Sequence, residues 1–212
     1  MQQSNSSSPC GILAIWNDCA PGREALYERW YRTEHLAERL AVPGFRTGRR
    51  FRRLADTGPQ FFTCYETRSP DVLYSEAYRN RVDNPSELTR EVMAGVFVNV
   101  SRTICRVVST SGEMRGGFVV TATASESKVL EAIARENPAR ENVVRTEIWS
   151  ADARPEEGNN AEQLIRGPDS HITGCALIET ASAGPAAALA RSIGQQHDCP
   201  AHAYGLMYEL VR

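Results

Sequence analysis

The chain has 212 residues, of which 42% are hydrophobic and 24% are charged, and its formal net charge is -2. This length and composition are typical of a globular protein with one or two cores. The one basic run contains Arg46, Arg49, Arg50, Arg52 and Arg53, and strand alternation would split it across two faces, which argues against a nucleic-acid-binding patch. No stretch of the sequence approaches the roughly 18 consecutive apolar residues of a membrane-spanning helix, so we expect neither nucleic acid nor membrane as a partner.

The six cysteines contain no Cys-x-x-Cys pair and no spacing typical of a disulfide framework. Free thiols are typical of a reducing compartment. Residues 1–9 are rich in Ser, Gln and Asn and have neither the basic charge nor the apolar core of a signal peptide. We therefore expect a cytoplasmic protein whose first nine residues are disordered.

Hydrophobic periodicity and turn residues divide the first half of the chain, residues 10–108, into strands and helices. Its predicted elements are a strand over 11–16, a helix over 23–41, a hairpin of strands over 45–54 and 60–65, a helical region over 69–95 and a strand over 96–108.

Residues 109–116 are small and polar, which is typical of a linker. The order of elements then repeats over residues 117–212. Its predicted elements are a strand over 117–124, a helix over 125–135, a strand over 143–150, a polar loop over 154–169, a strand over 171–179, a helix over 185–193 and a strand over 204–211. Each half thus has the β-α-β-β-α-β order of a ferredoxin-like unit, so the predicted class is α+β with two such units packed together by their sheets.

One segment combines a helix end with acid/base groups: Trp30-Tyr31-x-x-Glu34-His35-Leu36, followed by Val42-Pro43-Gly44-Phe45. This segment and the order of elements resemble the dimeric α/β barrel superfamily, in particular its EthD-like branch. The resemblance implies that the two halves form one barrel within a single chain, as a fused pseudo-dimer. It also implies a small hydrophobic or aromatic molecule as the partner, no cofactor and no metal, and further association of fused chains into a homodimer as an option.

The candidate catalytic residues are His35, Glu34 and Tyr31. On a continuous helix, Tyr27, Tyr31 and His35 are four residues apart and lie along one line. The imidazole of histidine can give and take a proton near neutral pH, and Glu34 is a candidate for orienting it. The same residues would also suit a structural role, since a histidine is favoured at a helix C-terminus and aromatic rings fill cores.

The resemblance implies a ligand cavity between the sheet and the helices. The residues expected to line it are Trp16, Asn17, Tyr27, Trp30, Arg49, Phe51, Phe62, Tyr65 and Phe97. Strand alternation places Arg49 and Phe51 on one face of their strand and Arg50 on the other. An arginine on the cavity side could hold a carboxylate or enolate oxygen.

We therefore expect a small cofactor-independent enzyme that performs acid/base chemistry, such as isomerisation, cyclisation, dehydration or decarboxylation, on an aromatic or enolisable molecule. Such chemistry belongs to catabolism or secondary metabolism. Two alternatives remain open: a cofactor-free monooxygenase, and a non-catalytic barrel that binds a small ligand or haem. The sequence His197-x-Cys199-x-x-His202 lacks a fourth ligand and does not have a familiar zinc spacing.

Overall fold

The computed structural model describes residues 10–136, 142–155 and 158–212. Residues 1–9, for which we predicted disorder, lie outside the described residues. So does the segment 137–140, which follows the first helix of the second half. Among the described residues, no helix is long and apolar enough to cross a membrane.

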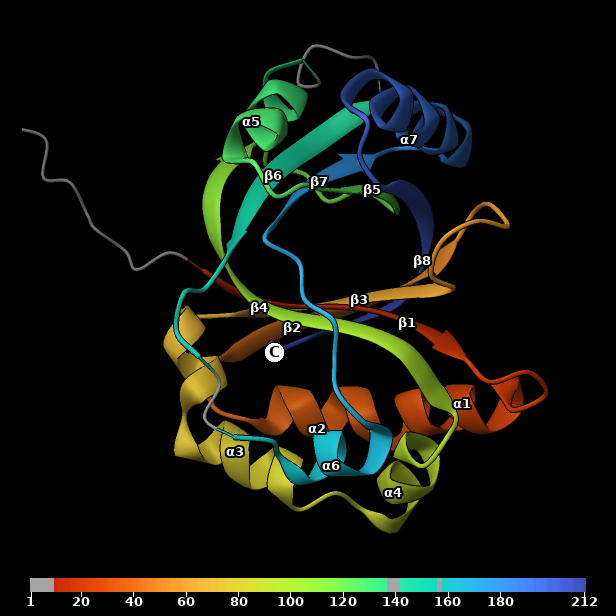
Figure 1. Ribbon diagram of the computed structural model, residues 1–212, viewed down its shortest axis with the longest axis vertical. Helices are drawn as coiled ribbons and strands as arrows, with labels where there is room; N and C mark the ends of the chain where they lie inside the picture. Colours follow the sequence, from red (N-terminus) through yellow and green to blue (C-terminus); the bar gives the residue numbers. More distant parts are fainter. Residues whose placement is uncertain (1–9, 137–141, 156–157) are drawn as a thin grey trace, which may run out of the picture.

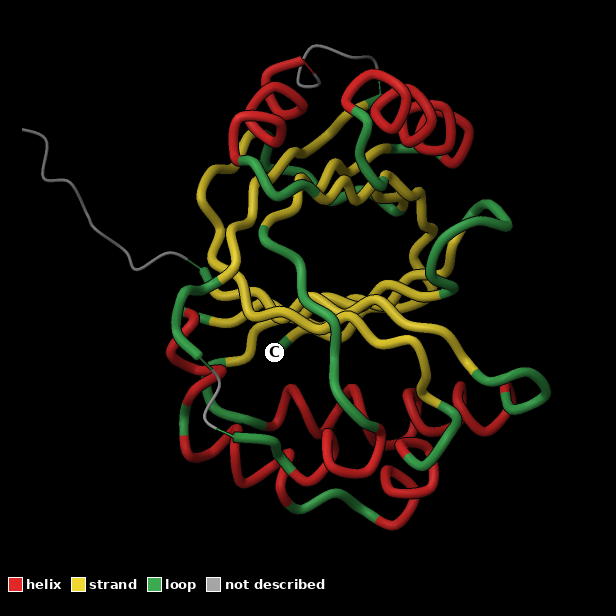
Figure 2. The backbone as a smooth tube through the Cα atoms, in the orientation of Figure 1, coloured by secondary structure: helices red, strands yellow, loops and turns green. Residues whose placement is uncertain are grey.

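Eight strands close into one antiparallel barrel in the order β1-β3-β2-β8-β5-β7-β6-β4, and β4 pairs with β1 to complete the ring. Figure 2 shows this ring between two layers of helices. The strands are β1 (Gly11–Cys19), β2 (Phe45–Arg53), β3 (Phe61–Thr67), β4 (Phe97–Ser111), β5 (Phe118–Thr123), β6 (Val143–Ala151), β7 (Gly174–Thr180) and β8 (Ala201–Val211).

The helices lie in two groups on opposite sides of the barrel (Figure 1). One side carries α5 (Ser127–Glu136) and α7 (Ala183–His197). The other side carries α1 (Glu24–Trp30), the π-helical turn η1 (Tyr31–His35), α2 (Leu36–Ala41), the 3-10 turn η2 (Pro70–Tyr74), α3 (Glu76–Asp83), α4 (Glu87–Met93) and α6 (Ala161–Arg166).

Helix α6 lies in the stretch between β6 and β7 for which the sequence analysis predicted only a polar loop. After β6 the chain runs to the helical layer that contains α1 to α4, and there α6 packs against α3 and α4. Its first turn is closed by a capping box, in which the Asn160 side chain accepts from the backbone N–H of Gln163 and the Gln163 side chain accepts from the Asn160 backbone. The later half of the chain therefore completes the helical layer that covers β1, β2 and β3.

The α+β class and the eight predicted strands agree with the structure, and several boundaries differ by a few residues. Strand β4 continues to Ser111, so residues 109–111 extend a strand and the connection to β5 is shorter than predicted. The single helix predicted over 23–41 is divided by η1. The 69–95 region is divided into η2, α3 and α4.

Strand alternation separates the buried side chains of β1, β2 and β3 into two cores. The core inside the barrel contains Ile12, Ala14, Trp16, Phe51, Phe62, Cys64, Cys105, Val119, Trp149, Cys175, Leu177 and Tyr204. The core between sheet and helices contains, among others, Leu13, Ile15, Tyr27, Trp30, Tyr31, Leu36, Leu40, Phe61, Tyr65 and Phe97. Any site that uses both sets must therefore span the thickness of the sheet.

Candidate functional site

His35 is the centre of a buried aromatic cluster between the sheet and the helices. Only 4% of the residue is exposed. The centroid of its ring lies 4.0 Å from that of Trp30, 5.1 Å from that of Tyr31 and 6.3 Å from that of Tyr65. These three neighbours are completely buried, so the imidazole is enclosed by rings from η1, the end of α1 and the middle of β3.

The π-helical turn determines which side chains surround the imidazole. The backbone N–H of Leu36 donates to the carbonyl of Tyr31, five residues earlier, and not to a carbonyl four residues earlier as in an α-helix. This wider turn brings residues five apart in sequence onto one side, which accounts for the contact between Trp30 and His35. Insertions of this kind are frequent at functional sites.

Gly48 of β2 lies close to the helical layer. A Cβ atom built on this residue would lie 2.7 Å from the side chain of Leu36, 2.9 Å from that of Leu40 and 3.0 Å from that of Tyr65. The absence of a side chain at position 48 therefore leaves room for these three side chains between β2 and α2.

Burial and charge keep the imidazole neutral. The pKa of His35 is well below its usual value, first because burial disfavours the imidazolium and then because the positive charges of Arg39, Arg50, Arg81 and Arg166 lie around it. Its Nδ1 atom is buried and has no hydrogen-bond partner. At neutral pH the ring is thus an uncharged group with an unoccupied nitrogen.

Two other polar atoms near His35 are also buried without a partner. The hydroxyl of Tyr65 has no hydrogen-bond partner, and burial raises the pKa of this phenol well above its usual value, so it stays protonated. The second is Nη1 of Arg39, whose side chain lies one helical turn after His35. The other terminal nitrogen of Arg39, Nη2, donates to both carboxylate oxygens of Glu162 at 2.5 Å.

Arg50 supplies a positive charge at the opposite end of the cluster. Its guanidinium carbon lies 3.6 Å from the ring centroid of Tyr31 and 4.6 Å from that of Tyr27. The same side chain donates from Nη2 to Glu28 at 2.7 Å. Arg50 is therefore held by a carboxylate and by ring faces, which is the usual setting of a cation-π contact.

The structure brings together seven of the residues predicted from the sequence. Asn17, Tyr27, Trp30, Tyr31, His35, Tyr65 and Phe97 all face the helical layer. Asn17 takes part by donating from Nδ2 to the Tyr27 hydroxyl at 2.5 Å.

Four predicted cavity residues lie on the opposite face of the sheet, and their assignment to the cavity beside His35 is wrong. Trp16, Phe51 and Phe62 pack inside the barrel, where Phe62 lies 4.9 Å from Trp16 and 5.6 Å from Phe51 between ring centroids. Arg49 also points into the barrel and donates to the buried carboxylate of Glu179 at 2.9 Å. The reason is the two-residue period of a strand, which gives Arg49 and Arg50 opposite faces.

The predicted pairing of Glu34 with His35 is also wrong. The Glu34 carboxylate accepts a hydrogen bond from the hydroxyl of Ser86 at 2.6 Å. Ser86 is the N-cap of α4, so Glu34 connects the helix of His35 to the start of α4. Neighbouring residues on a helix point in different directions, which explains why Glu34 faces α4 while His35 faces the sheet.

The sequence analysis did not identify Arg39 and Glu162 as site residues. Arg39 continues the four-residue spacing of Tyr27, Tyr31 and His35, so the spacing itself contained the signal. Glu162 lies 123 positions after Arg39, and no local pattern connects the two.

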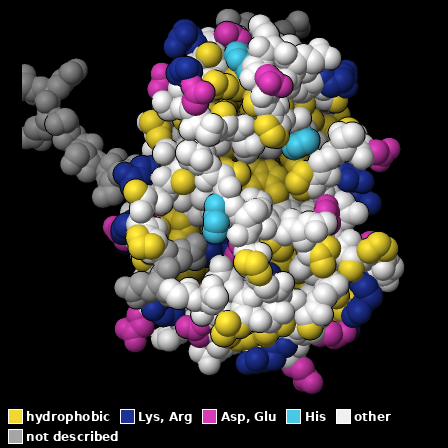
Figure 3. All heavy atoms as spheres, in the orientation of Figure 1, with side chains coloured by type: hydrophobic (Ala, Val, Ile, Leu, Met, Phe, Trp, Pro, Cys, Tyr) yellow, Lys and Arg dark blue, Asp and Glu magenta, His cyan; other side chains and the backbone are white. Residues whose placement is uncertain are grey.

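A surface hollow of about 590 Å³ between α4, β4 and α6 reaches the edge of this cluster. Phe97 and Arg166 line it, and the ring of Phe97 lies 6.0 Å from that of Trp30. On the face of the molecule shown in Figure 3, acidic and basic side chains are scattered around the outline of the molecule and do not gather into one patch.

Two of the three histidines of the second half are engaged elsewhere. Nδ1 of His171 lies 2.7 Å from the carbonyl oxygen of Arg102, and Nε2 of His197 lies 3.3 Å from the carboxylate of Glu136. Within the described ranges, no three His, Cys, Asp or Glu side chains are grouped so that they could hold a metal ion.

No protein-family model matches the sequence, and a search of curated proteins finds no significant match. Solved structures with the same fold do exist. An anthrone oxidase-like protein superposes with a TM-score of 0.63 at 8% identity, covering 97% of this chain and 94% of the other. A candidate monooxygenase from Fusobacterium nucleatum gives 0.59 at 9% identity, covering 97% and 95%. A candidate chlorite dismutase gives 0.54 at 12% identity, covering 95% and 96%. The chain therefore shares the overall antiparallel barrel fold of these solved structures.

Proposed function

We propose that the chain is a small cofactor-independent enzyme in which His35 transfers a proton to and from an aromatic or enolisable molecule. The observation that carries the proposal is the neutral, buried imidazole whose Nδ1 atom has no protein partner. Most buried polar atoms in folded proteins are hydrogen-bonded, and a buried atom without a protein partner can be satisfied by a ligand, an ion or a water molecule. The aromatic rings around His35 would favour a flat, apolar substrate.

The reaction that fits this arrangement begins with the removal of a proton from a carbon next to a carbonyl group. Nδ1 of His35 accepts the proton and becomes an imidazolium, while the electron pair moves into an enolate. The Tyr65 phenol, kept protonated by burial, donates a hydrogen bond to the enolate oxygen. Return of the proton to another carbon completes an isomerisation, and loss of a β-hydroxide instead completes a dehydration.

The position of the hollow at Phe97 supports an approach from the side of α4 and α6. The rings of Phe97 and Trp30 separate this hollow from His35. A substrate that reaches Nδ1 by this route has to displace these two rings. The aromatic ring of the substrate then replaces contacts that Phe97 and Trp30 make with neighbouring rings, which limits the free-energy cost of moving these two side chains.

The direct test is solvent deuterium exchange into an enolisable aromatic ketone such as 2-tetralone, followed by proton NMR. We expect the protein to accelerate exchange and His35→Gln to slow the catalysed rate by about a hundredfold, the size of a general-base contribution. Phe62→Leu, a change inside the barrel, is the matched control and should keep the rate. Equal rates for the wild type and His35→Gln would refute the role of His35.

The two neighbours described as an oxidase-like protein and a monooxygenase favour oxygenation as a second candidate. In that case the carbanion formed by His35 would react with molecular oxygen. An oxygen electrode separates the two candidates, because isomerisation consumes no oxygen.

The residues around His35 do not fit a haem. A proximal histidine needs space for iron and a porphyrin beside its nitrogen. Here the imidazole is stacked 4.0 Å from Trp30 and enclosed by two tyrosine rings. In this arrangement of rings His35 is therefore not placed to bind a haem iron.

We also propose that the barrel is a fused pseudo-dimer of two ferredoxin-like repeats, residues 10–108 and 117–212, close to the EthD-like branch. The element order supports it: β1-helix-β2-β3-helix-β4 is followed by β5-α5-β6-β7-α7-β8. In this view the second repeat carries no counterpart to Glu34-His35 and supplies scaffold and α6. We also propose a cytoplasmic location and a further homodimer of fused chains.

A further inference from the structure

Between the sheet and the helices, the buried polar atoms without a hydrogen-bond partner include Nδ1 of His35, the hydroxyl of Tyr65 and Nη1 of Arg39, together with Nε of Arg50 and of Arg81. His35, Tyr65 and Arg39 are 4%, 0% and 3% exposed. An unpartnered buried donor costs free energy comparable to that of a lost hydrogen bond. Side chains that carry such atoms on adjoining elements are therefore candidates for binding a polar ligand.

The atoms of His35, Tyr65 and Arg39 belong to one connected set of side chains. The rings of His35 and Tyr65 have centroids 6.3 Å apart. His35 and Arg39 are four residues apart and both face inward. Arg39 lies over the ring of Tyr78 at 5.9 Å, and Phe45 contacts the rings of both Tyr78 and Tyr65, at 5.6 and 5.9 Å. The positive charge of Arg39 also acts on the pKa values of His35 and Tyr65.

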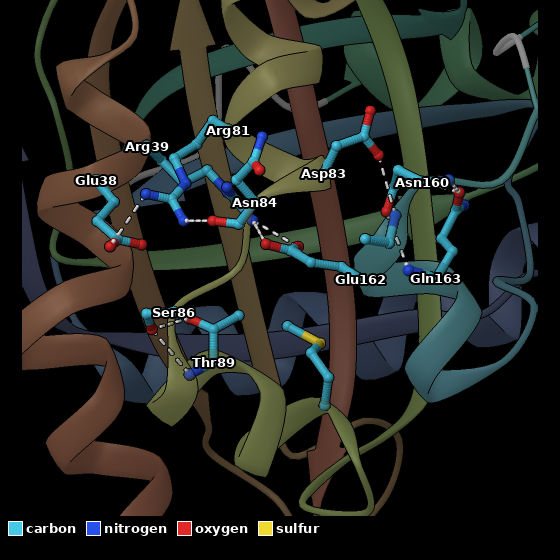
Figure 4. Close-up of polar contacts among 12 residues, drawn as sticks. Glu38, Arg39, Arg81, Asp83, Asn84, Ser86, Thr89, Asn160, Glu162 and Gln163 are labelled. Atoms are coloured by element: carbon cyan, nitrogen blue, oxygen red, sulfur yellow. Dashed lines mark hydrogen bonds and ion pairs between the residues drawn. The ribbon is translucent and has the colours of Figure 1, made fainter.

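Glu162 determines how Arg39 is presented. Both carboxylate oxygens of Glu162 lie 2.5 Å from Nη2, which leaves Nη1 as the terminal nitrogen available for another acceptor. Figure 4 shows Glu162 reaching Arg39 from α6, beside the capped start of that helix at Asn160. The arginine is therefore held by a segment that comes from far along the chain.

We propose that Arg39 and Tyr65 form an oxyanion subsite beside His35, so that the substrate is an aromatic acid or another molecule carrying an anionic oxygen next to its reacting carbon. Arg39 would bind this oxygen through Nη1, and Tyr65 would donate to it from its hydroxyl. Glu162 is a positioning residue that acts through Arg39. The inference rests on the proposed function, because it names the substrate class of the same site. A charged oxygen is the acceptor that two unpartnered donors favour most.

The test compares benzoate with benzamide, which have the same ring and differ in charge. Binding is measured by titration calorimetry and by the shift of the melting temperature, because a ligand of the folded state raises it. For the wild type we expect benzoate to bind at least tenfold more tightly than benzamide.

Tyr65→Phe removes only the unpartnered hydroxyl, so it leaves the hydrogen bonds of the free protein intact. We expect it to weaken benzoate binding about tenfold, to change benzamide binding threefold or less and to leave the melting temperature equal or higher. Tyr204→Phe, inside the barrel, is the matched control and should alter neither affinity. The double variant Arg39→Met, Glu162→Leu removes the donor together with its buried partner and should abolish the preference for benzoate.

Equal affinities of benzoate and benzamide, or a Tyr65→Phe variant with unchanged benzoate affinity, would overturn the subsite. So would a lack of binding of both probes at millimolar concentration. None of these results affects deuterium exchange into 2-tetralone, a neutral ketone, so the subsite can fail while the general-base role of His35 stands.

Discussion

The buried ion pair between Arg39 and Glu162 gives the sharpest stability prediction. The side chains are 3% and 7% exposed, and they connect α2 to α6 across the helical layer. Glu162→Gln keeps the shape of the side chain but removes its charge, so the guanidinium stays buried without a counterion. Removing one partner of such a pair costs about 3 to 5 kcal/mol.

This loss is a large part of the stability expected for a protein of this size, which is about 5 to 15 kcal/mol. With an m-value of about 2.5 kcal/mol/M, a loss of about 4 kcal/mol moves the urea midpoint down by about 1.5 M. Equilibrium unfolding followed by tryptophan fluorescence measures this shift. The double variant Arg39→Met, Glu162→Leu should recover most of the loss, because a buried pair can be replaced by apolar residues of similar volume.

The matched control is an exposed pair of the same chemistry. Arg23 and Glu91 are 3.0 Å apart and about half exposed, with side-chain exposures of 47% and 53%. Glu91→Gln should cost less than about 1 kcal/mol, since solvent screens the interaction. A Glu162→Gln variant that loses no more stability than Glu91→Gln would refute the reasoning.

Three further predictions concern protonation, packing and thiol chemistry. Because the pKa of His35 is lowered in the folded protein, unfolding takes up a proton below pH 6.5, so the free energy of unfolding should fall between pH 7 and pH 5 by up to about 2 kcal/mol more in the wild type than in His35→Gln. An equal pH dependence of the two proteins in urea unfolding would contradict this. Phe62→Ala leaves a cavity among the rings inside the barrel and should cost about 3 to 5 kcal/mol by the same measurement, whereas a cost below 1 kcal/mol would mean that the interior is loosely packed. All six thiols are free, and only Cys10 and Cys199 are partly exposed, so a thiol reagent at pH 7.5 should modify at most these two cysteines of the folded protein. Rapid reaction of a third thiol would contradict the burial of the other four.

Local patterns predicted most of the elements because each strand and helix carries its own signal. The strand periodicity around Phe45, the turn after it and the apolar stripe of the first helix depend only on neighbours in the sequence. The capping box at Asn160 and Gln163 was such a signal too, and it predicts α6 although the sequence analysis assigned a polar loop there.

Two other features depended on which residues of a strand share one face and on the π-helical turn in the first helix. The assignment of Trp16 and Phe62 to the cavity ignored the faces that alternation gives them, which the sequence already contained. The π-helical turn at Tyr31–His35 has no comparable sequence signal, because one extra residue in a helix is stabilised by the packing around it.

By itself the sequence determined the α+β class, the order of the elements and the position of His35 on a helix that covers the sheet, since all of these follow from short-range periodicity. Only the tertiary structure decided which partners the imidazole has and that Glu162 reaches Arg39 from 123 residues away. The physical reason is that the hydrogen-bond partners of a buried polar atom come from segments that folding brings together from distant parts of the chain. A local sequence pattern contains no information about which of these segments meet.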